Sequence, residues 1–303
     1  CMNAETAMYM MRSPHQMGII CVDVTNKCDL ACSNCTRLLE NQEEFWEMSP
    51  ENFRQALRSL RGYRGIVAMI GGNPCMHRNF VELCEIFREE VPCKQQRGLW
   101  TNNYFKHRKV IEETFGVFNL NAHGKKKAGE QLTDLANKMK ADDPENIVWN
   151  YVDHAEHAPL LTAMQDIYSD SQQMWAKIAR CEINHEWSAS IVQNKGELRY
   201  YFCEVAASFD LARGTDYGYP IEDGWWKKHI LQMRSQVERF CPGCGVPAKQ
   251  KPNLDKEEVD VFTETNRDLA EKSAKIKKRK VIFLKPEDRL EASKKVTQYG
   301  VLA

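Results

Sequence analysis

The sequence lacks an excess of charge of either sign, because its 303 residues include 42 Lys and Arg and 42 Asp and Glu. A neutral chain has no net field that draws it to nucleic acid or to an anionic membrane, so we expect neither as a partner. No stretch approaches the ~20 apolar residues of a membrane span. The first residues lack the basic-then-apolar pattern of a secretory signal. Together these absences predict a cytoplasmic globular protein.

Cysteine, by contrast, is plentiful, with 12 residues. Cys28, Cys32 and Cys35 follow an apolar segment at residues 18–25 that reads as a buried strand. The chain has this closely spaced group and a second one, Cys241 and Cys244. Together with the missing secretory signal, they favour reduced, metal-binding thiols over disulfides. Electron-transfer clusters usually take four cysteines, so a loop of three predicts a four-iron cluster with one iron open for chemistry. A zinc knuckle and buried free thiols are the alternatives, and the position directly after an apolar strand argues against both.

The spacing of this loop resembles the CxxxCxxC motif of the radical S-adenosylmethionine (SAM) family, where the loop follows the first barrel strand. The resemblance implies that Cys28, Cys32 and Cys35 are the catalytic ligands of a 4Fe-4S cluster. In that family the amino and carboxylate groups of SAM chelate the open iron. One electron then splits the sulfonium and yields a 5′-deoxyadenosyl radical, which takes a hydrogen atom from the substrate. An external reductant such as flavodoxin or ferredoxin is the implied electron donor.

Strand and helix patterns alternate from residue 18 to about 175, which predicts an α/β fold with a parallel barrel. The expected strands lie at residues 18–25, 65–70, 98–103, 117–123 and 147–152. The family resemblance implies an open, partial (βα)6 barrel, and the sixth strand has no clear place between 160 and 190. The C-terminal ends of strands face the ligand in such barrels. Asp153, His154 and His157 are therefore candidate substrate contacts.

A second family motif follows the second expected strand. Gly71, Gly72, Asn73 and Pro74 resemble the GGEP segment, whose backbone receives the amino group of SAM. Glycines at this place let the backbone approach a ligand closely, and Asn73 replaces the usual acid with an uncharged acceptor.

Two asparagines are further candidate SAM contacts by the same resemblance. Asn102 follows the third expected strand, where the family often has a Thr-Asn pair, and an ordinary turn residue is the alternative interpretation. Asn121 lies on the fourth strand, where a polar side chain often meets the ribose or carboxylate of SAM. The alternation of that strand places Asn119 and Asn121 on one face.

Four cysteines remain beyond residue 180, and they are Cys181, Cys203, Cys241 and Cys244. Two β-rich runs around Asn194-Lys195-Gly196 predict a hairpin between the first two, and a helix at about 225–239 leads to the CxxC pair. This order resembles the Twitch extension, a shortened SPASM domain, and implies an auxiliary 4Fe-4S cluster held by all four cysteines. A structural zinc site is the competing interpretation, because four thiolates suit either metal.

The expected organisation is an N-terminal segment (1–17), a radical SAM partial barrel (18–180), a small α+β Twitch-like domain (181–248) and a charged tail (249–303). In the tail, the basic run 272–280 is expected to form a solvated helix face. The apolar residues 281–284 are expected to form a strand.

The sequence thus predicts a radical SAM enzyme with two 4Fe-4S clusters, one of them auxiliary. The motifs leave the fate of the substrate radical open. The first hypothesis is oxidation, epimerisation or rearrangement of a small molecule, and the second is modification of a peptide or protein side chain. A zinc-binding protein without enzymatic activity is the third.

Overall fold

The computed structural model describes residues 2–121, 126–143, 145–151, 159–249, 259–277 and 280–284. Its main sheet has eight strands in the order β5-β4-β3-β2-β1-β6-β7-β8. The strands are β1 (Ile19–Asp23), β2 (Ile66–Ile70), β3 (Arg97–Thr101), β4 (Val117–Asn121), β5 (Ile147–Tyr151), β6 (Ser188–Asn194), β7 (Glu197–Tyr201) and β8 (Tyr219–Pro220). Neighbours from β5 through β1 to β6 pair in parallel, whereas β7 and β8 are antiparallel additions.

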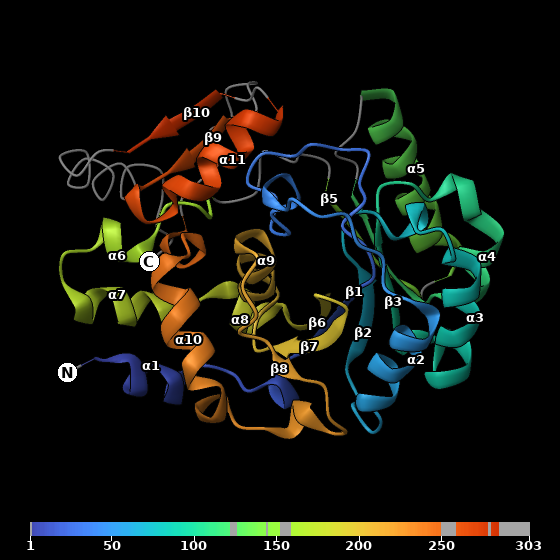
Figure 1. Cartoon of the computed structure of the whole chain (residues 1–303). Helices are drawn as coiled ribbons and strands as arrows, with labels where there is room; N and C mark the ends of the chain where they lie inside the picture. Colours follow the sequence, from blue (N-terminus) through green and yellow to red (C-terminus); the bar gives the residue numbers. More distant parts are fainter. Residues whose placement is uncertain are drawn as a thin grey trace.

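The outer face of the sheet is covered by α2 (Pro50–Ser59), α3 (Phe80–Glu90), α4 (Arg108–Thr114) and α5 (Lys126–Asp142) (Figure 1). The other helices are α1 (Ala4–Met10), α6 (Met164–Ile167), α7 (Ser171–Ile178), α8 (Glu182–Glu186), α9 (Glu204–Arg213), α10 (Arg234–Phe240) and α11 (Arg267–Lys277). The α2 helix begins as the sequence predicts, since the Ser49 side chain accepts the Asn52 N–H and Pro50 occupies the first turn. None of the helices in the described ranges has the length and apolar character that crossing a membrane requires.

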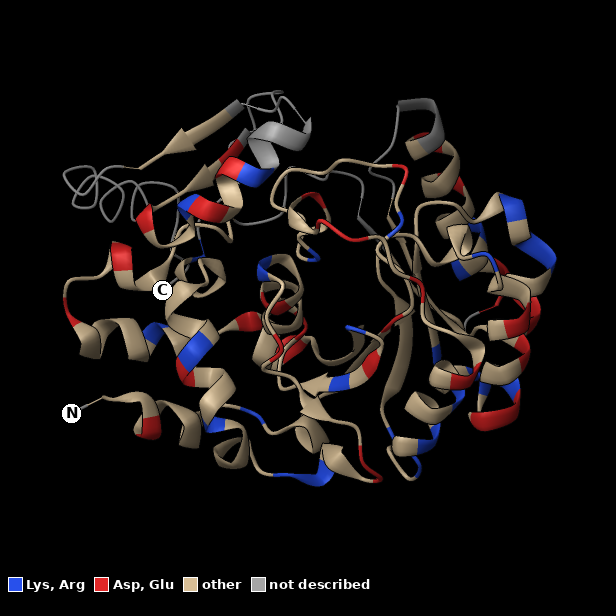
Figure 2. Cartoon of the chain, in the orientation of Figure 1, with Lys and Arg blue, Asp and Glu red and all other residues tan. Residues whose placement is uncertain are grey.

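Basic and acidic residues are interspersed over the outer helices α2, α3 and α4 (Figure 2). Ion pairs join two of these helices, since Arg54 of α2 lies 2.7 Å from Glu89 and 3.0 Å from Glu90 of α3. The balanced charge of the sequence is therefore also mixed locally on this layer.

The sheet buries apolar side chains on both faces, as parallel sheets do. All five residues of β1 are buried. Ile20 and Val22 pack into the main core beneath the helices, whereas Ile19 and Cys21 join a smaller cluster inside the barrel with Trp100. This inner cluster fills one end of the barrel and leaves the other end for polar side chains.

The predicted hairpin is present as β6 and β7, with Lys195 and Gly196 in the left-handed conformation (φ 49° and 85°) that tight hairpin turns use. Its first strand also pairs in parallel with β1, so β6 is the sixth parallel strand that the sequence left unassigned. The expected α/β class with a parallel, partial barrel is confirmed. What the sequence did not reveal is that β6 lies beside β1, at the opposite side of the sheet from β5.

A second, two-stranded sheet lies near the end of the described chain. Its strands, β9 (Val259–Phe262) and β10 (Lys280–Phe283), are parallel and are connected through α11. The strand expected at 281–284 is confirmed as β10, and we call residues 259–284 the C-terminal unit. The candidate substrate contacts Asp153, His154 and His157 lie outside the described residues.

Candidate active site

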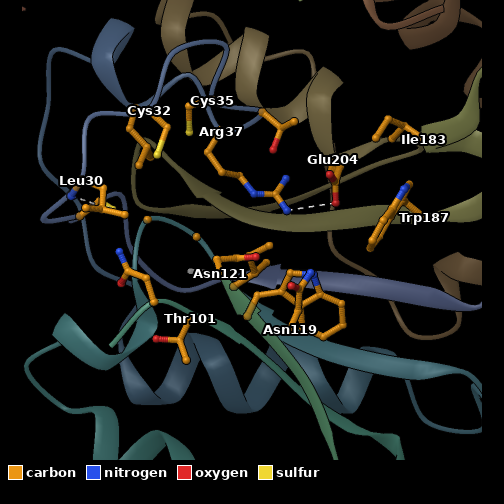
Figure 3. A pocket seen from close by; sticks show the side chains of 18 of the residues that line it. Leu30, Cys32, Cys35, Arg37, Thr101, Asn119, Asn121, Ile183, Trp187 and Glu204 are labelled. Carbon is orange, nitrogen blue, oxygen red and sulfur yellow. Dashed lines mark hydrogen bonds and ion pairs between the residues drawn. The ribbon is translucent and has the colours of Figure 1, made fainter. Parts of the chain in front are cut away.

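A cavity of about 410 Å³ lies at the C-terminal ends of β1 to β4 (Figure 3). Cys28, Cys32 and Cys35, from the loop after β1, form part of its wall. Four of the other predicted residues also line the cavity, and they are Gly71, Gly72, Asn102 and Asn121. The structure thus brings residues from four successive strand ends to one place, which is where parallel barrels bind their ligands.

The cysteine loop is irregular and half-buried. Cys28, Cys32 and Cys35 are each of intermediate exposure, and the Leu30 N–H points at Cys28 Sγ at 3.4 Å. Asn34 adopts φ 52°, a left-handed conformation that non-glycine residues rarely take. Within the described ranges, no three His, Cys, Asp or Glu side chains are grouped so that one metal ion would bind them.

The two glycines bring the chain after β2 against the cysteine loop. The Gly72 N–H donates to the Thr25 carbonyl and the Asn73 N–H to the Lys27 carbonyl, each at 2.7 Å. A Cβ on Gly71 would lie 2.3 Å from the Thr25 carbonyl oxygen, and one on Gly72 would lie 2.3 Å from that of Lys27. The close approach that these glycines permit is therefore first of all to the chain just before Cys28.

Asn73 and Pro74 are not among the residues that line the cavity. The Asn73 side chain is buried and accepts the Thr101 hydroxyl at 2.8 Å, while its Nδ2 donates to Asn102 Oδ1 and to Asp29 Oδ1. Asn102 Nδ2 also points at Asp29 Oδ1, at 3.4 Å. Asn73 thus ties the end of β3 to the cysteine loop, a role that the family resemblance did not suggest.

Sequence reasoning missed the arginine at the centre of the cavity. Arg37 lies between two acids, with Nε 3.1 Å from Asp23 Oδ1 and Nη2 3.0 Å from Glu204 Oε2, and all three side chains are buried. Ser190 donates to Asp23 at 2.6 Å, and Ser188 donates to Glu204. Burial raises the pKa of Asp23, and the nearby carboxylates raise the pKa of Arg37 despite its burial. The arginine therefore keeps its charge although its side chain is buried.

The wall of the cavity contains buried polar atoms without a hydrogen-bond partner among the described residues. Nη1 of Arg37 and Oδ1 of Asn119 are of this kind, and their residues are only 5% and 3% exposed. Both residues line the cavity, and Figure 3 shows Arg37 reaching across it between the cysteines and Trp187. Buried polar groups are nearly always satisfied, so a donor and an acceptor without partners indicate a place for a polar ligand. The face that Asn119 shares with Asn121 was the only signal in the sequence.

Tryptophans close the inner end of the cavity. Trp100 and Trp187 line it directly. Trp149 lies between them, with ring centroids 5.8 Å from Trp100 and 6.5 Å from Trp187. This apolar end lowers the local dielectric and strengthens the electrostatic interactions of Arg37.

The second group of cysteines surrounds a cavity of about 20 Å³ that is otherwise almost entirely apolar. Its thiols come from Cys181, Cys203, Cys241 and Cys244. Cys181 and Cys203 precede the first residues of α8 and α9, and the CxxC turn follows α10. Burial raises the pKa of Cys181 to about 11 and that of Cys244 to about 12. The predicted set of four is thus brought together, as neutral thiols that a bound metal would have to deprotonate.

The two cavities are neighbours. Ile183 and Val246 line both of them. The cavities of the two cysteine groups therefore share part of their walls.

No protein-family model matches the sequence, and none of the curated proteins matches it. The solved structures that are similar to this chain include those of BtrN and SuiB. The crystal structure of BtrN in complex with AdoMet and 2-DOIA has a TM-score of 0.49 at 15% identity, and the match covers 78% of this chain and 96% of BtrN. SuiB of Streptococcus suis, bound to the precursor peptide SuiA, has a TM-score of 0.36 at 13% identity, covering 82% of this chain and 73% of SuiB. One is recorded with a small molecule and the other with a peptide, and both statements concern those proteins alone.

Proposed function

We propose that this chain is a radical SAM enzyme that cleaves SAM reductively and abstracts a hydrogen atom from a small-molecule substrate. The observation that carries the proposal is the meeting of two separate sequence motifs at one cavity. Cys28, Cys32 and Cys35 face the same space as Gly71 and Gly72. The two motifs follow the neighbouring parallel strands β1 and β2, so their order along the chain and their meeting place both agree with the family pattern.

The residues of the cavity suit the group that the proposal requires. Cysteine thiolates are the usual ligands of iron-sulfur clusters, and Cys28, Cys32 and Cys35 would hold one at the cavity wall. When bound and reduced, such a cluster supplies the electron that splits the sulfonium of SAM. Asn102 and Asn121, at the ends of β3 and β4, are the proposed polar contacts of SAM.

The chain's own side chains supply binding, orientation and exclusion of water. Arg37 Nη1 would donate to a ligand oxygen, and Asn119 Oδ1 would accept from a ligand hydroxyl or amino group, which satisfies both atoms. Trp100 and Trp187 would keep water from the inner end. The volume of about 410 Å³ falls within the range of about 300–1,000 Å³ that small-molecule pockets occupy, which suits a ligand of the size of SAM.

We further propose that Cys181, Cys203, Cys241 and Cys244 hold an auxiliary 4Fe-4S cluster. If the four thiols around this apolar cavity all bound the cluster, they would form a closed ligand shell, so this group would bind no substrate while all four ligands are in place. Its position beside the main cavity suits electron transfer with a substrate radical.

The proposal is tested by anaerobic reconstitution of the purified protein with iron and sulfide. We expect about eight irons per chain for two clusters, and formation of 5′-deoxyadenosine from SAM when dithionite is added. Replacing Cys28, Cys32 or Cys35 with Ala should abolish this cleavage, whereas Cys93→Ala, which alters an exposed thiol outside both groups, should not. Cleavage that survives the triple replacement would refute the proposal. Transfer of deuterium from labelled candidate substrates into 5′-deoxyadenosine would separate a small molecule from a peptide.

A further inference from the structure

The C-terminal unit contacts the cysteine loop. The Asn34 N–H, directly before Cys35, donates to Asp260 Oδ1 at 3.0 Å. A few residues on, Asn41 Nδ2 donates to the Leu269 carbonyl at 2.6 Å. Lys272 adds an ion pair with Glu43 at 2.9 Å. A segment more than 200 residues away in sequence therefore holds the loop from Asn34 onward.

The same unit contacts the second group of cysteines. Asn266 is fully buried, and its Nδ2 donates to the Gly243 carbonyl, inside the Cys241–Cys244 turn, at 2.8 Å. Its Oδ1 accepts Arg213 Nη2 at 2.6 Å. Figure 1 shows the unit packed across the top of the molecule, between the loop after β1 and the end of α10. Residues 260–269 thus connect the two cysteine groups on the outside of the protein.

Asp260 contacts the loop at Asn34, the residue with a left-handed backbone conformation. Asn34 adopts φ 52°, in the left-handed region that non-glycine residues populate sparsely and that asparagine enters more readily than most. Contacts with the surrounding structure help to keep such a conformation. Asp260 is 5% exposed, so its hydrogen bond to Asn34 is shielded from competing water.

We propose that Asp260 is a positioning residue, which sets the conformation of the loop that carries Cys35, and that the C-terminal unit holds both cysteine groups in a fixed relation. The expected effect on a bound cluster rests on the proposed function, whereas the expected effect on the conformation of the loop does not. Asp260 acts through Asn34 and touches no reacting atom.

Hydrogen exchange of the full chain without iron tests the loop directly. Asp260→Leu and Asp260→Ala should each speed exchange of the Asn34 amide about tenfold, because they remove its acceptor. Asp260→Asn keeps an Oδ1 acceptor and should stay within about threefold of the wild type. Asp268→Leu is the matched control, since Asp268 lies on the same unit with a largely exposed side chain. If the Asn34 amide exchanged at the wild-type rate in both Asp260→Leu and Asp260→Ala, the proposal would be overturned.

The second contact has a corresponding test. Asn266→Ala should speed exchange of amides in the Cys241–Cys244 turn about tenfold, since that turn loses its buried donor. Unchanged exchange there would overturn the part of the proposal that concerns the second group of cysteines. Exchange in β1 reports in every variant that the barrel is still folded.

The reconstituted protein provides a readout that a purely structural role would not change. In the wild type, the electron paramagnetic resonance spectrum of the reduced first cluster is expected to change when SAM is added. Asp260→Leu should alter that spectrum, and Asp260→Asn should restore it. A wild type that binds no iron at Cys28, Cys32 and Cys35 would refute the proposed function, while the exchange test would still decide the role of Asp260. A wild-type spectrum in Asp260→Leu would contradict positioning of the cluster.

Discussion

Arg37 and Glu204 form a buried ion pair with 3.0 Å between Nη2 and Oε2, although 167 residues separate them in sequence. Arg37 follows Cys35 by two residues, and Glu204 directly follows Cys203. Asp23, at the end of β1, holds the same guanidinium from the other side. The pair therefore joins the two cysteine-bearing segments inside the protein, as the C-terminal unit does outside.

Removing the arginine should destabilise the fold strongly. Arg37→Leu leaves Asp23 and Glu204 as neighbouring buried acids without their cation, and breaking a buried pair in this way costs about 3–5 kcal/mol. We expect a loss of that size in the free energy of unfolding from urea denaturation. Arg54→Leu, which breaks partly exposed pairs with Glu89 and Glu90, should cost at most about 1 kcal/mol. Equal losses in the two variants would contradict the burial argument.

The second group of cysteines should be separable from the first. Replacing Cys241 and Cys244 with Ala removes two of the four ligands, so the reconstituted protein should lose about four irons. Some SAM cleavage should remain, because Cys28, Cys32 and Cys35 belong to the other cavity. An unchanged iron count, with zinc lost instead, would assign this group to zinc.

Gly71 should not tolerate a side chain. Its φ is 136°, and a Cβ added at this position would lie 2.3 Å from the Thr25 carbonyl oxygen, so Gly71→Ala must displace the chain before Cys28. We expect a loss of more than about 1 kcal/mol in unfolding free energy, together with lower iron retention at the first cysteine group. Gly18→Ala is the control, since nothing lies within 4 Å of a Cβ at that position. A Gly71→Ala variant as stable as Gly18→Ala would show that the loop adapts freely.

His77 should make stability fall in mild acid. The ring is buried as a neutral imidazole, with Nε2 2.9 Å from the Met48 carbonyl and Nδ1 accepting the Asn79 N–H at 3.0 Å. Burial lowers the pKa of His77 and Arg78 lowers it further, whereas the Met48 carbonyl, Glu47 and Glu82 act in the opposite direction. Between this lowered pKa and about 6.5 the unfolded chain binds more protons, so stability rises with pH in that window and is lost as the pH falls through it.

Thermal unfolding at pH 7.5 and pH 5.5 measures this effect. The drop in Tm on acidification should be smaller in His77→Gln than in the wild type. His15→Gln is the control, because it changes an exposed histidine. Its Tm should drop on acidification by as much as that of the wild type. An identical drop in the wild type and His77→Gln would show that His77 contributes nothing to the pH dependence.

Local patterns predicted most of the barrel and part of the site. The strands β1 to β5, the hairpin β6–β7 and the capped start of α2 follow from apolar runs and turn residues, which act over a few neighbouring positions. Asn119 was visible as a polar residue on the face of Asn121. Arg37 was not, because nothing near it in sequence marks it as the partner of Glu204. The sequence predicted that Asn73 contacts SAM, whereas in the structure its side chain forms hydrogen bonds with Thr101 and Asn102.

The sequence by itself determined the α/β class, the three-cysteine loop and the glycines after β2, because spacing and residue type decide which chemistry and which backbone a short segment permits. Only the tertiary structure decided that β6 lies beside β1 and that Glu204 faces Arg37. It also decided that Asp260 reaches the Asn34 amide. These contacts join segments far apart in the chain, and their partners are selected by how the whole core packs, which no local pattern encodes.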